Sequence, residues 1–145
     1  MIVWEMAVVL HYLREAVCAS WADTPDKRGT NAPEPLSEMF SSEDIAPESR
    51  AVMEAEALDF FRFSREWLAD LQASTEVARQ FWLVRNGVQT RFMEGARGWL
   101  KPGAEAALTA RAITAGTRRL VVGDDWRLYQ VTAQPEGGQY GQAHT

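Results

Sequence analysis

The chain has 145 residues, of which 46% are hydrophobic, and it carries a formal net charge of −5. This size and apolar content, with six Trp and six Phe, exclude a wholly disordered protein, and no run approaches the ~20 apolar residues of a membrane-spanning helix. Glu5 interrupts the apolar N-terminus, which makes a poor secretory signal, and one Cys with two His predicts neither an internal disulfide nor a structural zinc site.

The charges are unevenly distributed along the chain. Residues 23–76 hold thirteen Asp or Glu against five Lys or Arg, whereas residues 77–145 hold five acidic residues against nine basic ones. Such an asymmetry indicates either a charged partner or an attraction between the two halves of the folded chain. The sequence leaves both interpretations open.

The first predicted element is a helix over residues 3–22. Apolar residues recur there at intervals of three and four, as on one helix face: Val3, Ala7, Leu10, Leu13, Val17 and Trp21. Val9, Tyr12 and Ala16 broaden that face, so most of the helix should be covered. Cys18 and His11 fall within it; Cys18 is expected to be a small buried hydrophobe, and neither residue is assigned a role.

A long surface loop is expected over about residues 23–44. Its first half is dense in turn-forming residues and has little to bury. Apolar anchors follow that could hold its far end to the core: Leu36, Met39, Phe40 and Ile45. The segment is either a binding loop or a tolerated surface excursion.

The longest helix is predicted over residues 48–72. Pro47 suits its first turn, because the N–H that proline lacks would be unpaired there. One apolar stripe runs along it: Val52, Ala55, Leu58, Phe61, Leu68 and Leu71. Ala57, Phe60, Ser64 and Trp67 extend the stripe sideways, which indicates a central helix whose aromatic side chains belong to the core.

Two more helices are predicted over residues 75–86 and 102–115. Ser74 is a good N-cap for the first, and Gly87 ends it in the manner of a left-handed C-cap. Gly116 ends the second. The loop between them carries two expected anchors, Phe92 and Trp99.

The last segment changes from a helical to a strand-like pattern. Residues 119–122 and 127–131 flank Gly123-Asp124-Asp125-Trp126, whose Gly and Asp favour a hairpin turn. An isolated hairpin is only marginally stable, so this one should pack on the helices. We therefore predict an α+β, mainly α protein, with about four helices packed with a C-terminal β-hairpin. Residues 1–134 should form a single globular domain, followed by a flexible tail over 135–145.

No residue pattern indicates catalysis. A nucleophile would need a neighbouring base, and the two histidines, His11 and His144, fall on a helix face and in the tail. Asp124 and Asp125 are ordinary turn formers, and no Gly-rich phosphate loop lies between a strand and a helix. We expect a protein that is not an enzyme, uses no cofactor or metal, and acts by binding.

Several stretches resemble a family of small proteins of bacteriophages and mobile elements. Residues 41–48 read SSEDIAPE, residues 78–87 read ARQFWLVRNG and residues 120–129 read LVVGDDWRLY. The corresponding family motifs are S-x-x-D-I-A-P-E, A-x-x-F-W-L-T-R-N-G-H-G-A-G-F-W-D and L-Y-V-G-D-D-G-x-I-Y. The segment YLREA at 12–16 with Trp21 resembles the family's opening helix, so that the resemblance covers most of residues 10–130 in order.

The chain departs from the family pattern in two places. Residues 88–94 read VQTRFME where the family has H-G-A-G-F-W-D, and Trp126 stands where the family has the turn glycine. Any chemistry of that loop in relatives would be lost or changed here. The resemblance implies a phage or plasmid origin and no particular mechanism.

Our first functional hypothesis is a phage-encoded accessory protein that binds and inhibits a host defence complex in the host cytoplasm, in the manner of an anti-CRISPR protein. The acidic segment or the long loop would make the contact, and an acidic surface could imitate DNA and occupy a nucleic-acid-binding immune effector. The alternative is a nucleic-acid-associated accessory protein, because basic residues alternate with aromatic ones in the second half. The oligomeric state is left open.

Two groups of residues are the candidate binding residues. The first is Asp124, Asp125 and Trp126, and the second is Arg91, Phe92 and Met93. The structural alternatives are a hairpin turn with a packing Trp for the first group and a loop anchor for the second.

Overall fold

The computed structural model describes residues 2–22, 34–94 and 98–132. Their helices are α1 (Val3–Cys18), α2 (Pro47–Ser64), α3 (Ser74–Arg85) and α4 (Ala104–Thr114). The strand β1 (Trp21–Ala22) pairs antiparallel with β2 (Glu34–Pro35), and β3 (Arg118–Val122) pairs antiparallel with β4 (Leu128–Thr132). The predicted α+β, mainly α class with a C-terminal hairpin is confirmed. Residues 23–33 of the expected loop and the expected tail lie outside the described residues.

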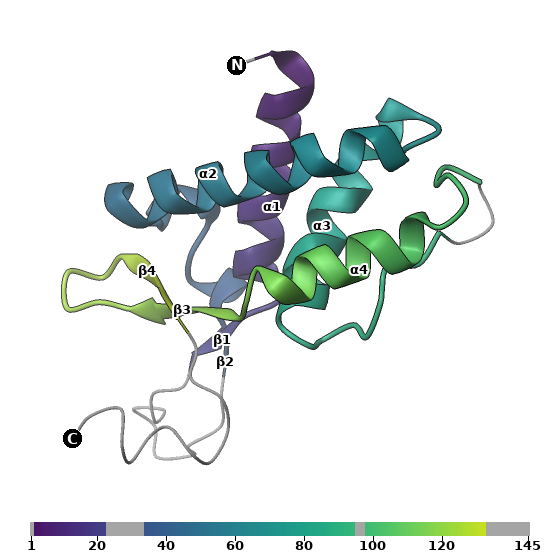
Figure 1. Ribbon diagram of the computed structural model, residues 1–145. Coiled ribbons are helices and arrows are strands. Elements are labelled where there is room, and N and C mark those ends of the chain that lie inside the picture. The colour runs from purple at the N-terminus through teal and green to yellow at the C-terminus, as the bar shows by residue number, and fades with distance from the viewer. Residues whose placement is uncertain (1, 23–33, 95–97, 133–145) are drawn as a thin grey trace.

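The helices cross one another around α1. α1 packs against both α2 and α3, and α3 also packs against α4. In Figure 1, α2 runs across α1, while the β3–β4 hairpin extends from the end of α4 and lies below the start of α2. β4 contacts α2, so the helices support the hairpin as its length requires.

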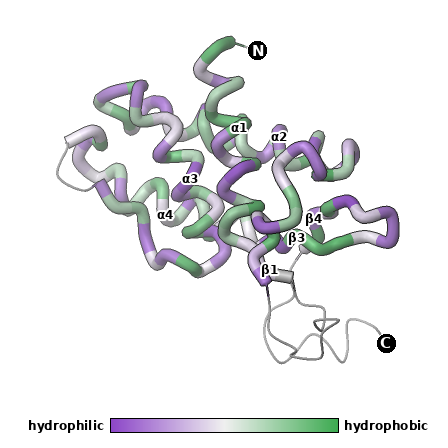
Figure 2. Tube along the Cα trace, turned by 180° about the vertical axis from the view of Figure 1, so that it is seen from behind, coloured by the Kyte–Doolittle hydropathy of each residue, from purple (hydrophilic) through white to green (hydrophobic). Residues whose placement is uncertain are grey.

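A stack of aromatic rings forms the centre of the core. The ring of Phe81 lies 4.1 Å from that of Phe60 and 5.2 Å from that of Tyr12, and Phe92 stacks on Phe60 at 5.5 Å. Three helices and the loop after α3 therefore meet in one stack, and the expected anchoring of Phe92 is confirmed. In Figure 2, hydrophobic (green) and hydrophilic (purple) residues alternate along the helices, as expected of helices that are covered on one side only.

The buried face of α1 differs from the predicted one. Its buried residues are Glu5, Val8, Val9, Tyr12, Leu13, Ala16 and Val17, whereas Val3 and Trp21 are exposed. Cys18 is also exposed, so the expectation that it is buried was wrong. α1 has apolar residues on two overlapping stripes, and periodicity alone does not say which stripe its neighbours cover.

α2 is shorter than predicted and buries the second of its two stripes. Its buried residues are Ser49, Met53, Ala57, Phe60, Phe61 and Ser64, whereas Val52 is exposed. After Ser64 the chain tightens into a 3-10 helix over Arg65–Trp67, and the backbone at the end of that helix pairs with a distant segment. The N–H of Ala69 donates to Trp99 O at 2.8 Å, and the N–H of Lys101 donates to Trp67 O at 2.9 Å.

Arg85, the last residue of α3, is buried and connects most of the elements. Its guanidinium donates to the carbonyls of Gly116 at 2.7 Å and Ala115 at 2.9 Å, which lie just after α4. It also donates to Tyr12 Oη at 2.8 Å and to Glu56 Oε1 at 3.1 Å. Carbonyls at a helix C-terminus have no intrahelical partner, so Arg85 satisfies groups that would otherwise be buried without one.

The two residues after Arg85 join α3 to the hairpin. Asn86 donates through Nδ2 to Trp82 O at 3.0 Å and accepts the N–H of Arg118 on Oδ1 at 2.8 Å. Gly87 has a φ of 73°, as the predicted left-handed end of the helix requires. Residues 81–87 (FWLVRNG) thus lie in the core and at the contacts of α3 with the neighbouring elements.

Candidate interaction site

The site begins with the turn between β3 and β4. The N–H of Trp126 donates to Gly123 O at 3.0 Å, and the N–H of Gly123 donates to Arg127 O at 2.8 Å. A Cβ on Gly123 would lie 2.6 Å from Cε1 of Tyr129, so any other residue at this position would have to displace the Tyr129 ring. The N–H of Arg127 donates to Asp125 Oδ1 at 3.1 Å and completes the turn.

Trp126 occupies the turn position at which glycine is favoured. Its φ is 63°, and it has the only positive φ of a non-glycine residue among those described. A bulky residue in this region costs of order 1–3 kcal/mol, and such strain concentrates at functional sites. Trp126 therefore keeps a backbone conformation that glycine would adopt without strain.

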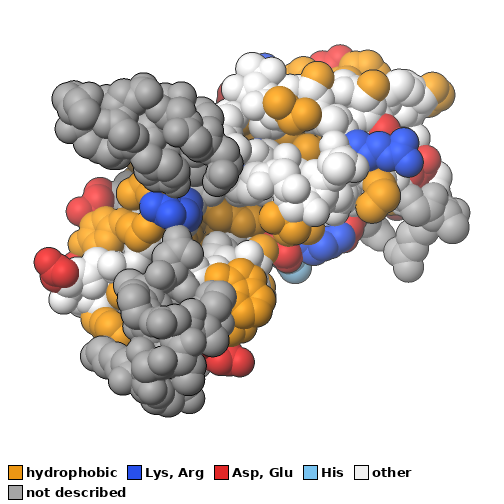
Figure 3. All heavy atoms as spheres, turned by 90° about the horizontal axis from the view of Figure 1, so that it is seen from below, with side chains coloured by type: hydrophobic (Ala, Val, Ile, Leu, Met, Phe, Trp, Pro, Cys, Tyr) orange, Lys and Arg blue, Asp and Glu red, His pale blue; other side chains and the backbone are white. Residues whose placement is uncertain are grey.

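The indole of Trp126 is held from one side and open on the other. Its ring lies 5.4 Å from the ring of Phe40, which is buried, and 59% of the residue remains exposed. Met39, next in sequence to Phe40, is exposed, so its expected role as a core anchor was wrong. We call Phe40 and Trp126, whose rings are in contact, the tip patch. Figure 3 shows hydrophobic side chains exposed at the end of the molecule that carries the hairpin, with acidic ones beside them.

Backbone contacts fix both sides of the tip patch. The N–H of Phe40 donates to Leu36 O at 2.8 Å, and Leu36 is itself fully buried. On the other side, the N–H of Ala46 donates to Leu128 O at 2.8 Å, which holds the start of β4 against the segment before α2. The patch is thus supported by the core rather than carried on a free loop.

The two aspartates of the turn differ in role. Asp125 Oδ2 accepts the hydroxyl of Tyr129 at 2.6 Å, and this hydrogen bond lowers the pKa of the Asp125 carboxyl and raises that of Tyr129. Asp125 is therefore a structural member of the turn. Asp124 is exposed and makes no hydrogen bond or ion pair within the described residues, so its carboxylate is open to a partner.

The second predicted group of binding residues does not join the first. Phe92 is fully buried, and its N–H donates to Thr109 Oγ1 at 2.8 Å. Gln80 holds the backbone of Met93, accepting its N–H at 2.9 Å and donating to its carbonyl at 3.0 Å. Phe92 therefore has no side-chain surface to offer a partner, which favours the loop-anchor interpretation for it, while Arg91 and Met93 are exposed beside it.

Ion pairs connect the acidic and the basic halves of the chain. Arg118 Nη2 lies 3.0 Å from Glu56 Oε2, Arg111 Nη2 lies 2.8 Å from Asp59 Oδ2, and Arg85 also binds Glu56. Attraction between the halves thus accounts for part of the charge asymmetry. The same pairs reduce the number of arginines that could bind phosphate, which weakens the nucleic-acid alternative.

The comparisons with known proteins give no relative. No family model, no curated protein and no solved structure matches the chain. Within residues 2–22, 34–94 and 98–132, no three His, Cys, Asp or Glu gather in a way that could hold a metal ion. No helix in the same part of the chain has the length and apolar character needed to cross a membrane.

Proposed function

We propose that the protein acts by binding another protein through the tip patch, with the exposed indole of Trp126 as the central contact. The supporting observation is a strained, half-exposed Trp that rests on a buried Phe. Trp is the residue type most enriched among the side chains that dominate protein–protein affinity, and such side chains act from rigid, well-packed positions. Glycine would adopt this turn conformation without strain, so the presence of a Trp supports a role for its side chain.

The charges around the tip patch define the partner's chemistry. Asp124 is exposed on one side of Trp126 and Arg127 is exposed on the other, while the charge of Glu48 acts on nearby Tyr129. With Asp125 in the turn, carboxylates outnumber the one guanidinium around the tip patch, so we expect the complementary surface to have an apolar pocket with more Lys or Arg than acidic residues beside it. Nucleic-acid-binding proteins carry such basic surfaces, and this is the class to which an immune effector would belong.

Together with the family resemblance, this supports our first hypothesis in a more specific form. The protein is a phage-encoded accessory protein that occupies a basic surface of a host defence complex, in the host cytoplasm, and thereby inhibits it. The hairpin tip, rather than the acidic segment as a whole, makes the contact. Inhibition follows if the occupied surface is one that the effector uses for its nucleic acid.

The experiment is an affinity capture from bacterial lysate with the wild-type protein and two matched variants. Trp126→Ala removes the indole, and Ile113→Ala removes a side chain with the same exposed fraction of 59% on α4. We expect a stoichiometric complex that survives nuclease and moderate salt, is retained by Ile113→Ala and is lost with Trp126→Ala. Loss of a central Trp costs about 2–4 kcal/mol, or roughly 30- to 1,000-fold in affinity.

Two results would contradict the proposal. Equal capture by Trp126→Ala and wild type would show that the tip patch is not the contact. If the captured material disappears with nuclease and falls steeply with salt, the protein binds nucleic acid instead of a host protein. A urea melt of each variant separates loss of binding from loss of folding.

A further inference from the structure

The Asp125 carboxylate spans the residue that carries the exposed indole. Its Oδ1 accepts the N–H of Arg127, two residues further along the chain, at 3.1 Å. The ring of atoms that this hydrogen bond closes contains both backbone dihedral angles of Trp126, as in the turns that aspartate side chains commonly form. The bond therefore holds Trp126 in its left-handed conformation, with a φ of 63°.

The other oxygen of the same carboxylate is held by Tyr129. The hydroxyl of Tyr129 donates to Asp125 Oδ2 at 2.6 Å, a length typical of a charge-assisted hydrogen bond, whereas the bond from Arg127 is longer. The hydrogen bond from Tyr129 also lowers the pKa of the Asp125 carboxyl, which favours the ionised form that accepts both bonds. Tyr129 thus fixes the orientation of the carboxylate on which the conformation of Trp126 depends.

The Tyr129 ring lies against the start of the turn. A Cβ on Gly123 would lie 2.6 Å from Tyr129 Cε1 and 2.9 Å from both Tyr129 Cδ1 and Asp125 Oδ1. The ring and the carboxylate are therefore both in close contact with the backbone of Gly123. We call the Asp125 carboxylate and the Tyr129 hydroxyl the turn clamp.

The turn clamp opposes a tendency of Trp126 to leave its conformation. A bulky residue with a positive φ is strained, and extended conformations are open to it if the turn is released. The indole lies 5.4 Å from the ring of Phe40 but is more than half exposed, so packing restrains it on one side. If the clamp opened, Trp126 would relax and its ring would leave Phe40. The orientation of the indole therefore depends on the clamp.

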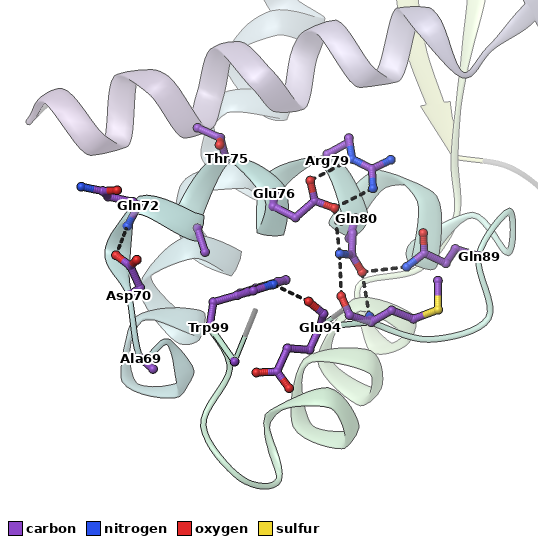
Figure 4. A pocket seen from close by; sticks show the side chains of 13 residues that line it. Ala69, Asp70, Gln72, Thr75, Glu76, Arg79, Gln80, Gln89, Glu94 and Trp99 are labelled. Atoms are coloured by element: carbon purple, nitrogen blue, oxygen red, sulfur yellow. Dashed lines mark hydrogen bonds and ion pairs between the residues drawn. The ribbon is translucent and has the colours of Figure 1, made fainter. Parts of the chain in front are cut away.

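Another polar side chain of the molecule holds a loop in a comparable way. Figure 4 shows Gln80 in the wall of a groove, where its amide accepts from Gln89 Nε2 at 2.7 Å and from the N–H of Met93 at 2.9 Å, and donates to Met93 O at 3.0 Å. Gln80 is buried, so these hydrogen bonds stabilise the fold. The turn clamp instead lies at the surface beside an exposed indole, so it stabilises a contact surface.

We propose that Tyr129 is a positioning residue for the tip patch: its hydroxyl, acting through the Asp125 carboxylate, holds Trp126 in the conformation that binds a partner protein. This inference rests on the proposed function of the tip patch. A side chain that is already ordered loses less conformational entropy on binding, which strengthens the complex. Removing the clamp should lower the fraction of binding-competent molecules, and with it the apparent affinity.

The first test measures the indole by NMR in the isolated protein. The probe is the Nε1–H signal of Trp126, identified as the one that Trp126→Phe removes. We expect an ordered indole with nuclear Overhauser contacts to the Phe40 ring in wild type, and a more mobile indole with weaker contacts in Tyr129→Phe. Tyr12→Phe is the matched control. It removes a buried hydroxyl that accepts from Arg85, so it should lower stability and leave the Trp126 signal unchanged.

A double-mutant cycle tests whether Tyr129 acts through Asp125. Asp125→Ala should mobilise the indole at least as much as Tyr129→Phe, because it removes both hydrogen bonds of the carboxylate. Tyr129→Phe should add no further effect in the Asp125→Ala background. An indole as ordered in Tyr129→Phe as in wild type, or two changes whose effects add, would overturn the proposal. Urea melts establish that each variant is folded.

The second test is capture of the host complex from bacterial lysate over a series of bait concentrations. Tyr129→Phe should need about three- to tenfold more bait than wild type for equal capture, as loss of one hydrogen bond predicts, and Tyr12→Phe should match wild type. Equal capture by Tyr129→Phe, where Trp126→Ala abolishes capture, would contradict the positioning role alone. Equal capture by Trp126→Ala would overturn the proposed function, and the positioning role in binding with it, whatever the order of the indole.

Discussion

Arg85 of α3 and Glu56 of α2 form an ion pair of 3.1 Å in which the arginine side chain is wholly buried and the glutamate is one-fifth exposed. The guanidinium also lies over the Phe81 ring, with its central carbon 4.9 Å from the ring centre. Glu56 in turn accepts from Gln130 of β4 at 3.1 Å. One charged pair therefore connects the helices to the hairpin that carries the tip patch.

Replacing Arg85 by leucine should destabilise the protein strongly. The change leaves the carbonyls of Ala115 and Gly116 without their donor, and breaking a buried pair costs about 3–5 kcal/mol. Arg118→Leu is the matched control, because Arg118 is partly exposed and Glu56 keeps Arg85; its cost should be about 1 kcal/mol. Urea unfolding measures both. An equal loss of unfolding free energy in the two variants would show that the buried Arg85 contributes no more to stability than the partly exposed Arg118.

The strain at Trp126 predicts a reversal of the usual order of alanine and glycine. At a residue with φ of 63°, alanine keeps the unfavourable backbone conformation and glycine does not. Trp126→Gly should therefore be more stable than Trp126→Ala by about 1 kcal/mol, although both lose the contact with Phe40. Thermal or urea unfolding of the two variants tests this directly. An alanine variant as stable as the glycine variant would mean that the turn relaxes.

The sequence predicted the fold where a local pattern determines the structure. The hairpin was placed to within one residue, since Gly123 and Asp125 supply a turn that local chemistry favours. The end of α2 was placed eight residues too late, because the pairing of Ala69 with Trp99 is a long-range backbone contact without a sequence signal. Boundaries set by such contacts cannot be predicted from periodicity.

The candidate site was predicted only in part, for a related reason. Trp126 was identified from its place beside two aspartates, but its contact with Phe40 joins residues 86 positions apart in the chain. Arg85 stands near the end of the helix predicted over residues 75–86, and nothing in its sequence neighbours indicates that it is buried. A buried arginine can be recognised only once Glu56 and the end of α4 are placed around it.

Phe81 should be among the costliest residues to truncate. Its ring stacks on Phe60 and on Tyr12, and it is fully buried, so Phe81→Ala should lower the free energy of unfolding by about 3–5 kcal/mol. Val88→Ala is the control: Val88 is exposed, and its loss should change stability by less than about 0.5 kcal/mol. A near-neutral Phe81→Ala would contradict the placement of α3 in the core.

Tyr12 should make the stability of the protein depend on pH in the alkaline range. Burial raises the pKa of its phenol from 10.0 to about 12, although the charge and hydrogen bond of Arg85 partly oppose this. The unfolded chain would then lose the proton first, so the stabilisation is complete below pH 10 and is lost between about pH 10 and 12. Urea unfolding at several pH values should show this fall, and Tyr12→Phe should flatten it while leaving the smaller contribution of Tyr129. The contrary result has two parts: the Tyr12 phenol of the folded protein titrates near its usual pKa, and the free energy of unfolding depends on pH in the same way in Tyr12→Phe as in wild type. That result would place Tyr12 in contact with water and contradict its burial against Arg85.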